Sequence, residues 1–166
     1  TNDIRSLINS LVVSKLDNCN ALLYGISQYD LGRLQKFQNS CARLIYGKPK
    51  YDHVTDLFNE LHWLPVRSRI CFKLLCYMYK CFHCCAPPYL TEILTVSNRH
   101  NLCFEQVLCN SSMGDKAFSV CGPKLWNALP TNIRSIETLN RFKSQLKHYF
   151  FTSFNLFASN LNRYRQ

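Results

Sequence analysis

The chain has 166 residues, 47% of them apolar, and its twenty basic and ten acidic side chains give a formal net charge of +10. This length and apolar content allow a packed core and exclude an intrinsically disordered chain. No window approaches the length of a bilayer-spanning helix, and the N-terminus lacks the basic start and cleavage site of a signal peptide.

The first part of the chain has the apolar spacing of two helices. Apolar residues recur every three or four positions over residues 3–24 and again over residues 30–46, where Asp30 can cap the second helix. Gly25 and Gly47 are expected to end the two helices, and the short link between them predicts an antiparallel hairpin. The core face of the second helix is predicted to consist of Leu31, Leu34, Phe37, Cys41, Leu44 and Ile45.

A basic turn (47–53) follows and leads to further helices. A short helix is expected over residues 54–61, and Pro65 suits the first turn of a longer helix, where its missing N–H group is no loss. The apolar stripe of this longer helix ends at the proline pair of APPYL (86–90). His62, between the two helices, is interpreted as a structural or surface residue.

Residues 98–121 have a different pattern. Two shorter apolar runs, 102–108 and 117–121, predict a small β-hairpin. After a glycine–proline pair, KLWNAL (124–129) fits a short helix. A last helix, capped at residue 135 or 138, is then expected to end at about Phe151.

Together these elements predict a mainly α-helical fold. The expected segments are a helical hairpin over residues 1–48, a helical middle region over 49–97, a small mixed α+β unit over 98–151 that ends in a helix, and a frayed basic tail over 152–166.

Ten cysteines would suit a disulfide scaffold, but a chain without a secretory signal is expected to keep them reduced. The expected location is therefore the nucleus or the cytoplasm, and the protein is not expected to be secreted. Most of the cysteines lie among apolar neighbours, where a free thiol behaves as a small hydrophobic group. Examples are Cys19, Cys41, Cys71, Cys76 and Cys121.

A zinc-stabilised module is one alternative. CFHCC (81–85) contains a Cys81-x-x-Cys84 pair with metal-ligand spacing. A second pair would have to come from Cys103 and Cys109, or from Cys71 and Cys76, and neither has the spacing of a standard zinc knuckle. No metal or other cofactor is therefore expected. A catalytic Cys–His site is likewise not indicated, since nothing in the sequence pairs a particular histidine with a cysteine and an orienting acid.

Six blocks of sequence, taken together and in order, resemble one family. The chain looks like the C-terminal part of the reverse transcriptase polyprotein of non-LTR retrotransposons (LINE elements, in the Jockey and chicken-repeat branch). The resemblance extends from about residue 4 to residue 151. Its blocks are SKLDNCNALLYG (14–25), LQKFQNSCARLI (34–45), DHVTDLFNELHWLPVRSRICFKLL (52–75), APPYL (86–90), GDKAFSVCGPKLWNALPTNIR (114–134) and FKSQLK (142–147).

In that family these blocks lie downstream of the polymerase palm domain. The resemblance therefore implies a thumb-like helical hairpin followed by a C-terminal region. The chain departs from the family pattern at two places. Family members commonly read LDYCNSLLYG, where this chain has Asn18 in place of tyrosine, and KALHGLAPPYL, where this chain reads KCFHCCAPPYL (80–90).

The protein is not expected to be an enzyme. Polymerase chemistry requires carboxylates that hold two metal ions, and reverse transcriptases supply them through a paired Asp–Asp that this chain lacks. Its ten acidic residues are instead scattered over predicted helix starts and surfaces. The endonuclease of the family, which lies far upstream, has no counterpart here either. No small-molecule substrate and no membrane partner are expected.

Nucleic-acid binding is the favoured function. Lysine and arginine on exposed helix faces can neutralise phosphates without reading sequence, and the resemblance implies RNA or an RNA–DNA duplex as the partner. Tyr46, Tyr51, Tyr77 and Tyr79 are candidates for base stacking, although such spacing is also typical of core residues. The candidate phosphate-binding residues are Lys36, Arg43, Lys48, Lys50, Arg67, Arg69, Lys73, Arg141, Lys143 and Lys147.

The alternative is a structural or interaction module, or a relic fragment, that packs against an absent palm domain. Large apolar helix faces left uncovered in the structure would favour this alternative, because their missing partner would be protein.

Overall fold

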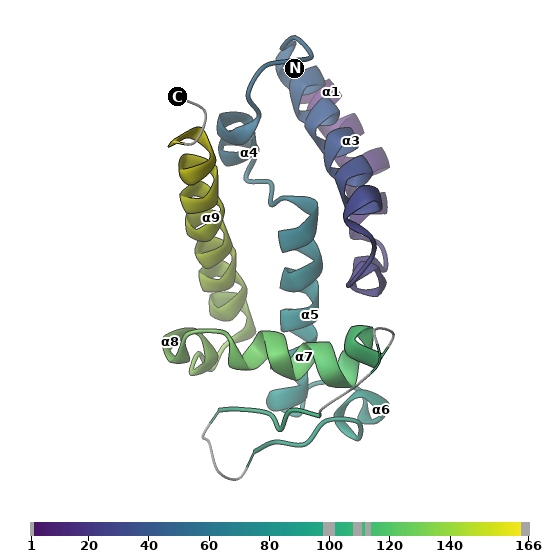
Figure 1. Ribbon diagram of the computed structural model, residues 1–166, viewed down its shortest axis with the longest axis vertical. Helices are drawn as coiled ribbons and strands as arrows, with labels where there is room; N and C mark the ends of the chain where they lie inside the picture. The colour runs from purple at the N-terminus through teal and green to yellow at the C-terminus, as the bar shows by residue number, and fades with distance from the viewer. Residues whose placement is uncertain (1, 98–101, 108–110, 112–113, 164–166) are drawn as a thin grey trace. The chain divides into compact units, whose positions relative to one another are not determined.

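The computed structural model describes residues 2–97, 102–107, 111 and 114–163, and within these ranges it describes side chains from residue 3 to residue 152 (Figure 1). The described chain is mainly helical, which confirms the predicted class, and within it no β-strand is formed. Val96 and Phe104 make one isolated antiparallel bridge. None of the described helices combines the length and the apolar character needed to cross a lipid bilayer.

The chain divides into two compact units. The first contains Thr1–Ile70 and His148–Gln166, and the second contains Cys71–Lys147. Their boundaries fall inside α5 (Val66–Phe82) and inside α9 (Leu139–Arg163). The expected division at residues 48, 97 and 151 stays a prediction.

The first unit begins with a helical segment that is shorter than expected. A single helix over 3–24 was the wrong expectation, because Asn18 is extended and Cys19 is left-handed, with a φ of 52°. The segment also contains a π-helical stretch in its middle. Its elements are α1 (Asn2–Ile8), the π-helix η1 (Asn9–Val13), α2 (Ser14–Asp17) and, after the break, the 3₁₀ helix η2 (Asn20–Leu23).

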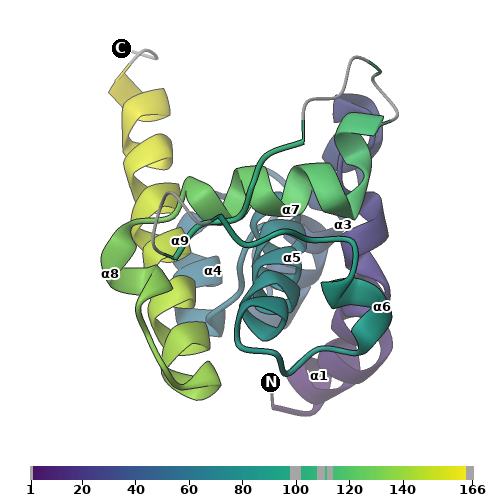
Figure 2. The same cartoon turned by 90° about the horizontal axis from the view of Figure 1, so that it is seen from below.

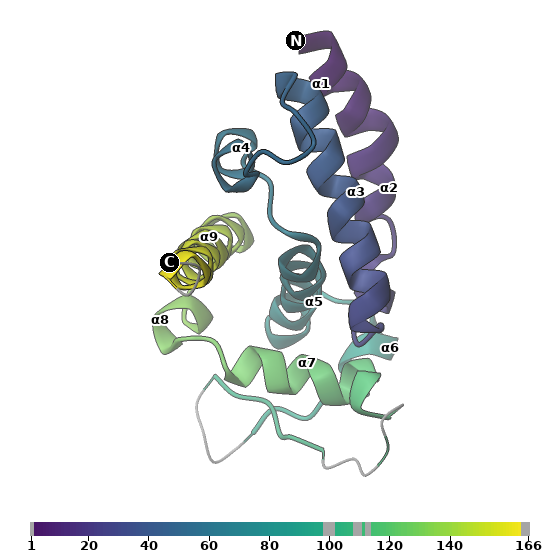
Figure 3. The same ribbon diagram turned by 45° about the horizontal axis from the view of Figure 1, so that its top comes forward.

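The second helix, α3 (Gln28–Tyr46), lies beside this segment and runs in the opposite direction (Figures 1 and 3). It starts earlier than expected, because the side chain of Ser27 and not that of Asp30 caps it: the Ser27 hydroxyl accepts from the Asp30 N–H at 3.1 Å. It ends as predicted at Gly47, whose φ of 62° is accessible to glycine without strain.

The buried face of α3 is rotated from the predicted one. Phe37 and Leu44, expected in the core, are 52% and 61% exposed. Gln38 is buried instead, and its amide donates to the Leu64 carbonyl at 2.9 Å, so the helix can bury a polar residue without an unsatisfied donor. The residues of α3 that are buried are Gln38, Cys41, Ala42 and Ile45.

A short helix, α4 (Thr55–Leu61), completes the core of the first unit. His62 follows it with a φ of 54°, and the next N–H, that of Trp63, donates to the Phe58 carbonyl at 2.9 Å. This is the Schellman pattern of a helix end, and its usual apolar contact is present as an edge-on contact between the Phe58 and Trp63 rings. His62 is thus a helix-ending residue with an exposed side chain, in agreement with its structural interpretation.

In the second unit, α7 (Phe118–Asn127) crosses α5 (Figures 1 and 2). Gly122 lies at the crossing: a Cβ atom there would sit 2.5 Å from the Met78 Sδ atom, so any larger residue would force the buried Met78 side chain to move. The predicted strand over 117–121 is wrong, since these residues enter α7. The helix continues through Pro123, an interior position where proline removes one helical hydrogen bond, and this concealed the helix in the sequence.

The core of the second unit is aromatic. Trp126 is fully buried, and its ring centroid lies 5.7 Å from that of Phe82 and 5.8 Å from that of Phe142. The Trp126 Nε1–H donates to the Leu102 carbonyl at 2.9 Å, and the Asn127 amide pairs with both backbone groups of Phe104. The helix α7 thereby holds the segment 102–107, which is the described part of the first run expected for the hairpin. Residues 108–110 lie outside the described chain.

The remaining elements of the second unit are short, apart from the start of α9. They are α6 (Pro88–Thr91), the 3₁₀ helix η3 (Gly114–Lys116) and α8 (Thr131–Arg134). The helix α9 begins directly after Thr138, as expected, but its backbone continues to Arg163, whereas a frayed tail was expected from residue 152.

Candidate nucleic-acid interface

The structure divides the ten candidate residues between the two units. The first unit contains Lys36, Arg43, Lys48, Lys50, Arg67 and Arg69, and the second contains Lys73, Arg141, Lys143 and Lys147. Six of the ten are exposed, namely Lys36, Lys48, Lys50, Arg67, Arg141 and Lys143, and the other four are half-buried.

The outward face of α3 combines basic and apolar side chains. Three large side chains on this face are exposed to solvent: Tyr29 by 76%, Phe37 by 52% and Leu44 by 61%. Arg33 and Lys36 lie between them at the spacing that places residues on one side of a helix. The face is described in full and contains no acidic residue; Asp30 lies at its edge, with a carboxylate oxygen 3.8 Å from Arg33 Nη1. Its residues are Tyr29, Arg33, Lys36, Phe37, Ser40, Arg43 and Leu44, which we call the α3 outward face.

The turn after α3 extends this basic surface. Arg43 fixes the turn, because its Nε and Nη2 groups donate to the Asp52 carbonyl at 3.0 and 2.9 Å. Lys48 and Lys50 are exposed within the turn, and the Lys50 ammonium lies 5.8 Å from the ring centroid of Tyr51. Tyr51 is 88% exposed. The turn therefore presents two lysines and one aromatic ring at the end of the α3 outward face.

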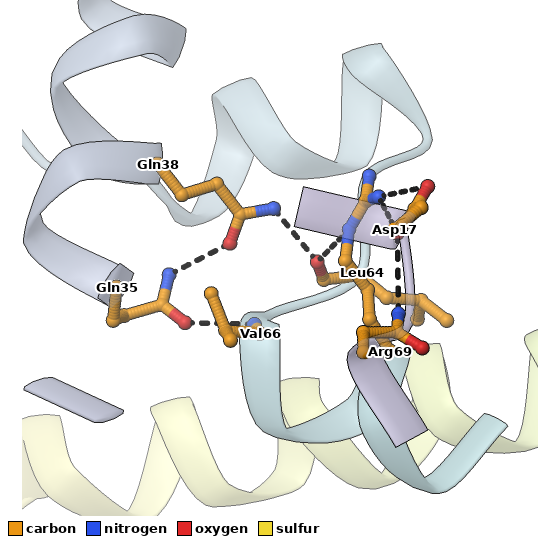
Figure 4. A network of polar contacts seen from close by, with 7 residues as sticks. Asp17, Gln35, Gln38, Leu64, Val66 and Arg69 are labelled. Atoms are coloured by element: carbon orange, nitrogen blue, oxygen red, sulfur yellow. Dashed lines mark hydrogen bonds and ion pairs between the residues drawn. The ribbon is translucent and has the colours of Figure 1, made fainter. Parts of the chain in front are cut away.

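Arg69 has a different role, because it forms an ion pair with Asp17 (Figure 4). Its Nη1 group lies 2.7 Å from each carboxylate oxygen, and its Nε group donates to the Leu64 carbonyl at 3.0 Å. Only 12% of the Arg69 side chain is exposed. Its charge is used inside the protein, so Arg69 is placed outside the interface proposed below.

The same network continues to α3 through the Leu64 carbonyl. Gln38 donates to this carbonyl, and Gln35 donates to the side-chain oxygen of Gln38 at 3.1 Å. The Gln35 side-chain oxygen in turn accepts from the Val66 N–H at 2.9 Å, which satisfies one free donor at the start of α5 (Figure 4). Three of the sequence blocks that carry the family resemblance therefore meet in one hydrogen-bonded network.

In the second unit, three lysines act electrostatically on the buried thiol of Cys76. Burial raises the pKa of the Cys76 thiol to about 11. The positive charges that act against this rise come from Lys143, Lys73 and Lys80. Two of the candidates, Lys73 on α5 and Lys143 on α9, thus act on the same thiol. The Lys73 ammonium also lies 5.7 Å from the ring centroid of Tyr77.

The four tyrosines expected to stack with bases differ in their exposure. Tyr79 is 3% exposed, and Tyr46 and Tyr77 are half-buried. Tyr51 is open to solvent. Sequence reasoning missed Tyr29 and Phe37; the signal was their position on the same helix face as Arg33 and Lys36, which the assignment of Phe37 to the core concealed.

The cysteines of CFHCC do not converge on a metal site. Cys81 is 5% exposed and burial raises its pKa, which disfavours the thiolate that a metal requires. Cys84 and Cys85 are exposed, and the Cys85 thiol donates to the His83 carbonyl. Among the residues with described side chains, no three Cys, His, Asp or Glu side chains are grouped to hold a metal ion. Cys109 lies outside the described residues.

Cys84 occupies a position that favours glycine. It ends α5 with a φ of 53°, and the following N–H, that of Cys85, donates to the Lys80 carbonyl at 2.7 Å. This is the left-handed position of a helix end, where glycine is the usual residue. We expect Cys84→Gly to raise the free energy of unfolding by about 0.5–1 kcal/mol, because relief of the left-handed strain exceeds the entropy cost of glycine.

Urea denaturation followed by circular dichroism measures this difference. Cys85→Gly is the matched control, since Cys85 is also an exposed cysteine but is not left-handed. The control is expected to be neutral or destabilising. A Cys84→Gly protein no more stable than the original chain would contradict the strain at this position.

Comparison of the chain with protein-family models, with curated proteins and with solved structures finds no match. Function therefore rests on the residues and on their placement.

Proposed function

We propose that this chain is the non-catalytic C-terminal accessory region of a LINE-type reverse transcriptase and that it binds RNA or an RNA–DNA duplex. The observation that carries the binding role is the acid-free α3 outward face with the two lysines of its following turn. The six ordered sequence blocks carry the family assignment.

The chemistry of this surface suits phosphate neutralisation. Lys36, Lys48 and Lys50 are exposed, and the net charge of the chain is +10. Lysine binds phosphate as a point charge and reads no sequence, so contact with the sugar–phosphate backbone of many sequences is expected. Because Arg43 holds the turn in place, the backbone that carries Lys48 and Lys50 is ordered before any ligand arrives.

The proposed role also relates elements of this fold to the expected thumb-like hairpin and C-terminal unit. We take the segment from α1 to α2 together with α3 as the thumb-like hairpin, since the two lie side by side in opposite directions. The extended segment around the Val96–Phe104 bridge would be the β portion of a small mixed C-terminal unit. This chain has no Asp–Asp pair. The carboxylates that polymerisation requires would therefore belong to a palm domain outside this chain.

Binding across a salt series tests the proposal. In filter-binding or electrophoretic shift assays, we expect the purified chain to bind duplex and single-stranded nucleic acid with an affinity that falls steeply as salt increases, because each neutralised phosphate releases counterions. Absent binding, or binding that does not respond to salt, would contradict the nucleic-acid role.

A protein-docking role is the second candidate, and a separate surface favours it. On α1 and η1, Ile4, Leu7 and Leu11 are 43%, 61% and 60% exposed and lie at helical spacing. A row of this kind is typical of a surface that another protein covers. Co-purification with a palm-containing segment from a polyprotein of this family tests the role. Leu7→Ser together with Leu11→Ser should abolish co-purification, and unchanged recovery would contradict it.

A further inference from the structure

A hollow lies beside the α3 outward face, between η2 and the first half of α3. It has a volume of about 550 Å³, within the range of sites that hold small organic groups. All of its walls belong to the first unit. The residues that line it are Leu23, Ile26, Asp30, Arg33, Leu34 and Phe37.

The lining of this hollow separates into an apolar part and a polar part. Leu23, Ile26 and Leu34 supply apolar surface, and Phe37 adds an aromatic ring that is 52% exposed. The polar part is the Asp30–Arg33 pair, whose side chains remain 54% and 70% exposed and therefore retain free hydrogen-bonding capacity. One aromatic ring, an apolar surface, one acceptor group and one donor group thus meet in one place.

These features match the chemistry of a nucleobase. A base has a flat π-face that stacks on an aromatic side chain and an edge of donors and acceptors. In a duplex the base edges pair with each other and the faces are stacked, so only unpaired nucleotides can offer both to a protein. The guanidinium of Arg33 and the carboxylate of Asp30 can bind such an edge.

We propose that this hollow binds an unpaired base of a single-stranded nucleic acid, with the base stacked on Phe37. This inference rests on the proposed nucleic-acid role and names the form of ligand that this site takes. Charge supports the choice of ligand, because Lys36 neighbours Phe37 on the outward face and Lys48 and Lys50 continue the same surface. The strand that places a base in the hollow thereby has cations available for its adjoining phosphates.

Tyr29 extends the same site at its other end. Its ring is 76% exposed, and the Arg33 guanidinium lies 5.9 Å from the ring centroid. Tyr29 and Phe37 are eight positions apart, which is about 12 Å along a helix. Each ring is therefore free to stack with a different base of the same strand.

A stacking variant with a matched control tests the proposal. Phe37→Ala removes the ring, whereas Tyr89→Ala removes an exposed aromatic ring of the second unit that belongs neither to the α3 outward face nor to the lining of the hollow. Fluorescence anisotropy would measure both variants with single-stranded RNA and DNA of about twelve nucleotides and with an RNA duplex of equal length. We expect Phe37→Ala to weaken single-strand binding about tenfold and to leave duplex binding within about twofold. Tyr89→Ala should behave as the original chain with all three ligands.

Phe37→Trp gives a direct report of stacking. The two natural tryptophans are buried, so quenching of the new exposed indole by single-stranded but not duplex ligand would show a base on its ring. Three outcomes would overturn the base site. Phe37→Ala could leave the single-strand affinity unchanged, or it could weaken duplex and single-strand binding equally. The fluorescence of Phe37→Trp could also show no quenching by a single-stranded ligand. The proposed nucleic-acid role fails separately, through loss of salt-dependent binding to every ligand. A difference between the RNA and DNA arms would show which sugar the site prefers.

Discussion

Replacement of Trp126 by alanine is expected to lower the free energy of unfolding by about 3–5 kcal/mol. Trp126 is fully buried, and its ring centroid lies within 6.0 Å of those of Phe82, Phe104 and Phe142. The substitution leaves a cavity among these rings and also removes the donor to the Leu102 carbonyl. Both losses fall on the second unit, where α7 holds the segment 102–107.

Urea denaturation followed by circular dichroism measures the Trp126→Ala effect. Tyr89→Ala is the control, because Tyr89 is an aromatic residue of the same unit that is 67% exposed, and its loss should change stability by less than about 0.5 kcal/mol. A loss of under about 1 kcal/mol in Trp126→Ala would contradict the aromatic core described for the second unit.

The second large effect is expected at Arg69, in the first unit. Arg69→Ala removes the ion pair with Asp17 and the bond to the Leu64 carbonyl. Hydrogen bonds to charged groups contribute about 1.5–3 kcal/mol to stability. The Asp17 side chain is 46% exposed, so screening by solvent reduces the energy of the ion pair. We expect a loss of about 2–3 kcal/mol of unfolding free energy.

A double-mutant cycle isolates the Asp17–Arg69 ion pair. Asp17→Ala, Arg69→Ala and the double variant should show a coupling of about 1 kcal/mol or more, since residues in one polar network are not additive. Arg67→Ala is the matched control: it removes an exposed arginine two residues away and should have little effect on stability. Additive effects in the cycle would show that the two side chains stabilise the first unit independently.

Apolar spacing predicted where most helices lie, because burial of one helix face is a local property of the sequence. Spacing could not fix the rotation of α3. The bond from Gln38 to the Leu64 carbonyl joins residues 26 positions apart, and it makes a polar residue more favourable in the core than Phe37. The break at Asn18 and Cys19 has the same origin: no glycine or proline marks it, since the left-handed residue is a cysteine.

The sequence could predict which basic residues the candidate site contains, but not which of them form ion pairs within the protein. The sequence identifies Lys36, Lys48 and Lys50 as exposed cations, and the structure places them on or next to one helix face. Sequence alone could not separate these lysines from Arg69, because the Asp17 carboxylate that pairs with it is 52 residues away. Arg43 is intermediate, since its guanidinium orders the turn that carries Lys48 and Lys50.

The dependence of affinity on salt in two variants of equal charge tests the proposed interface most directly. One variant carries Lys36→Ala, Lys48→Ala and Lys50→Ala, and the other carries Arg5→Ala, Lys15→Ala and Lys116→Ala, which are exposed cations elsewhere on the chain. For an RNA–DNA duplex, the slope of log affinity against log salt changes by about 0.9 for each phosphate that the protein no longer neutralises. We predict that the slope falls by about 2–3 in the first variant and is nearly unchanged in the second. Equal slopes in the two variants would mean that net charge alone drives binding, and would contradict an interface on α3 and its turn.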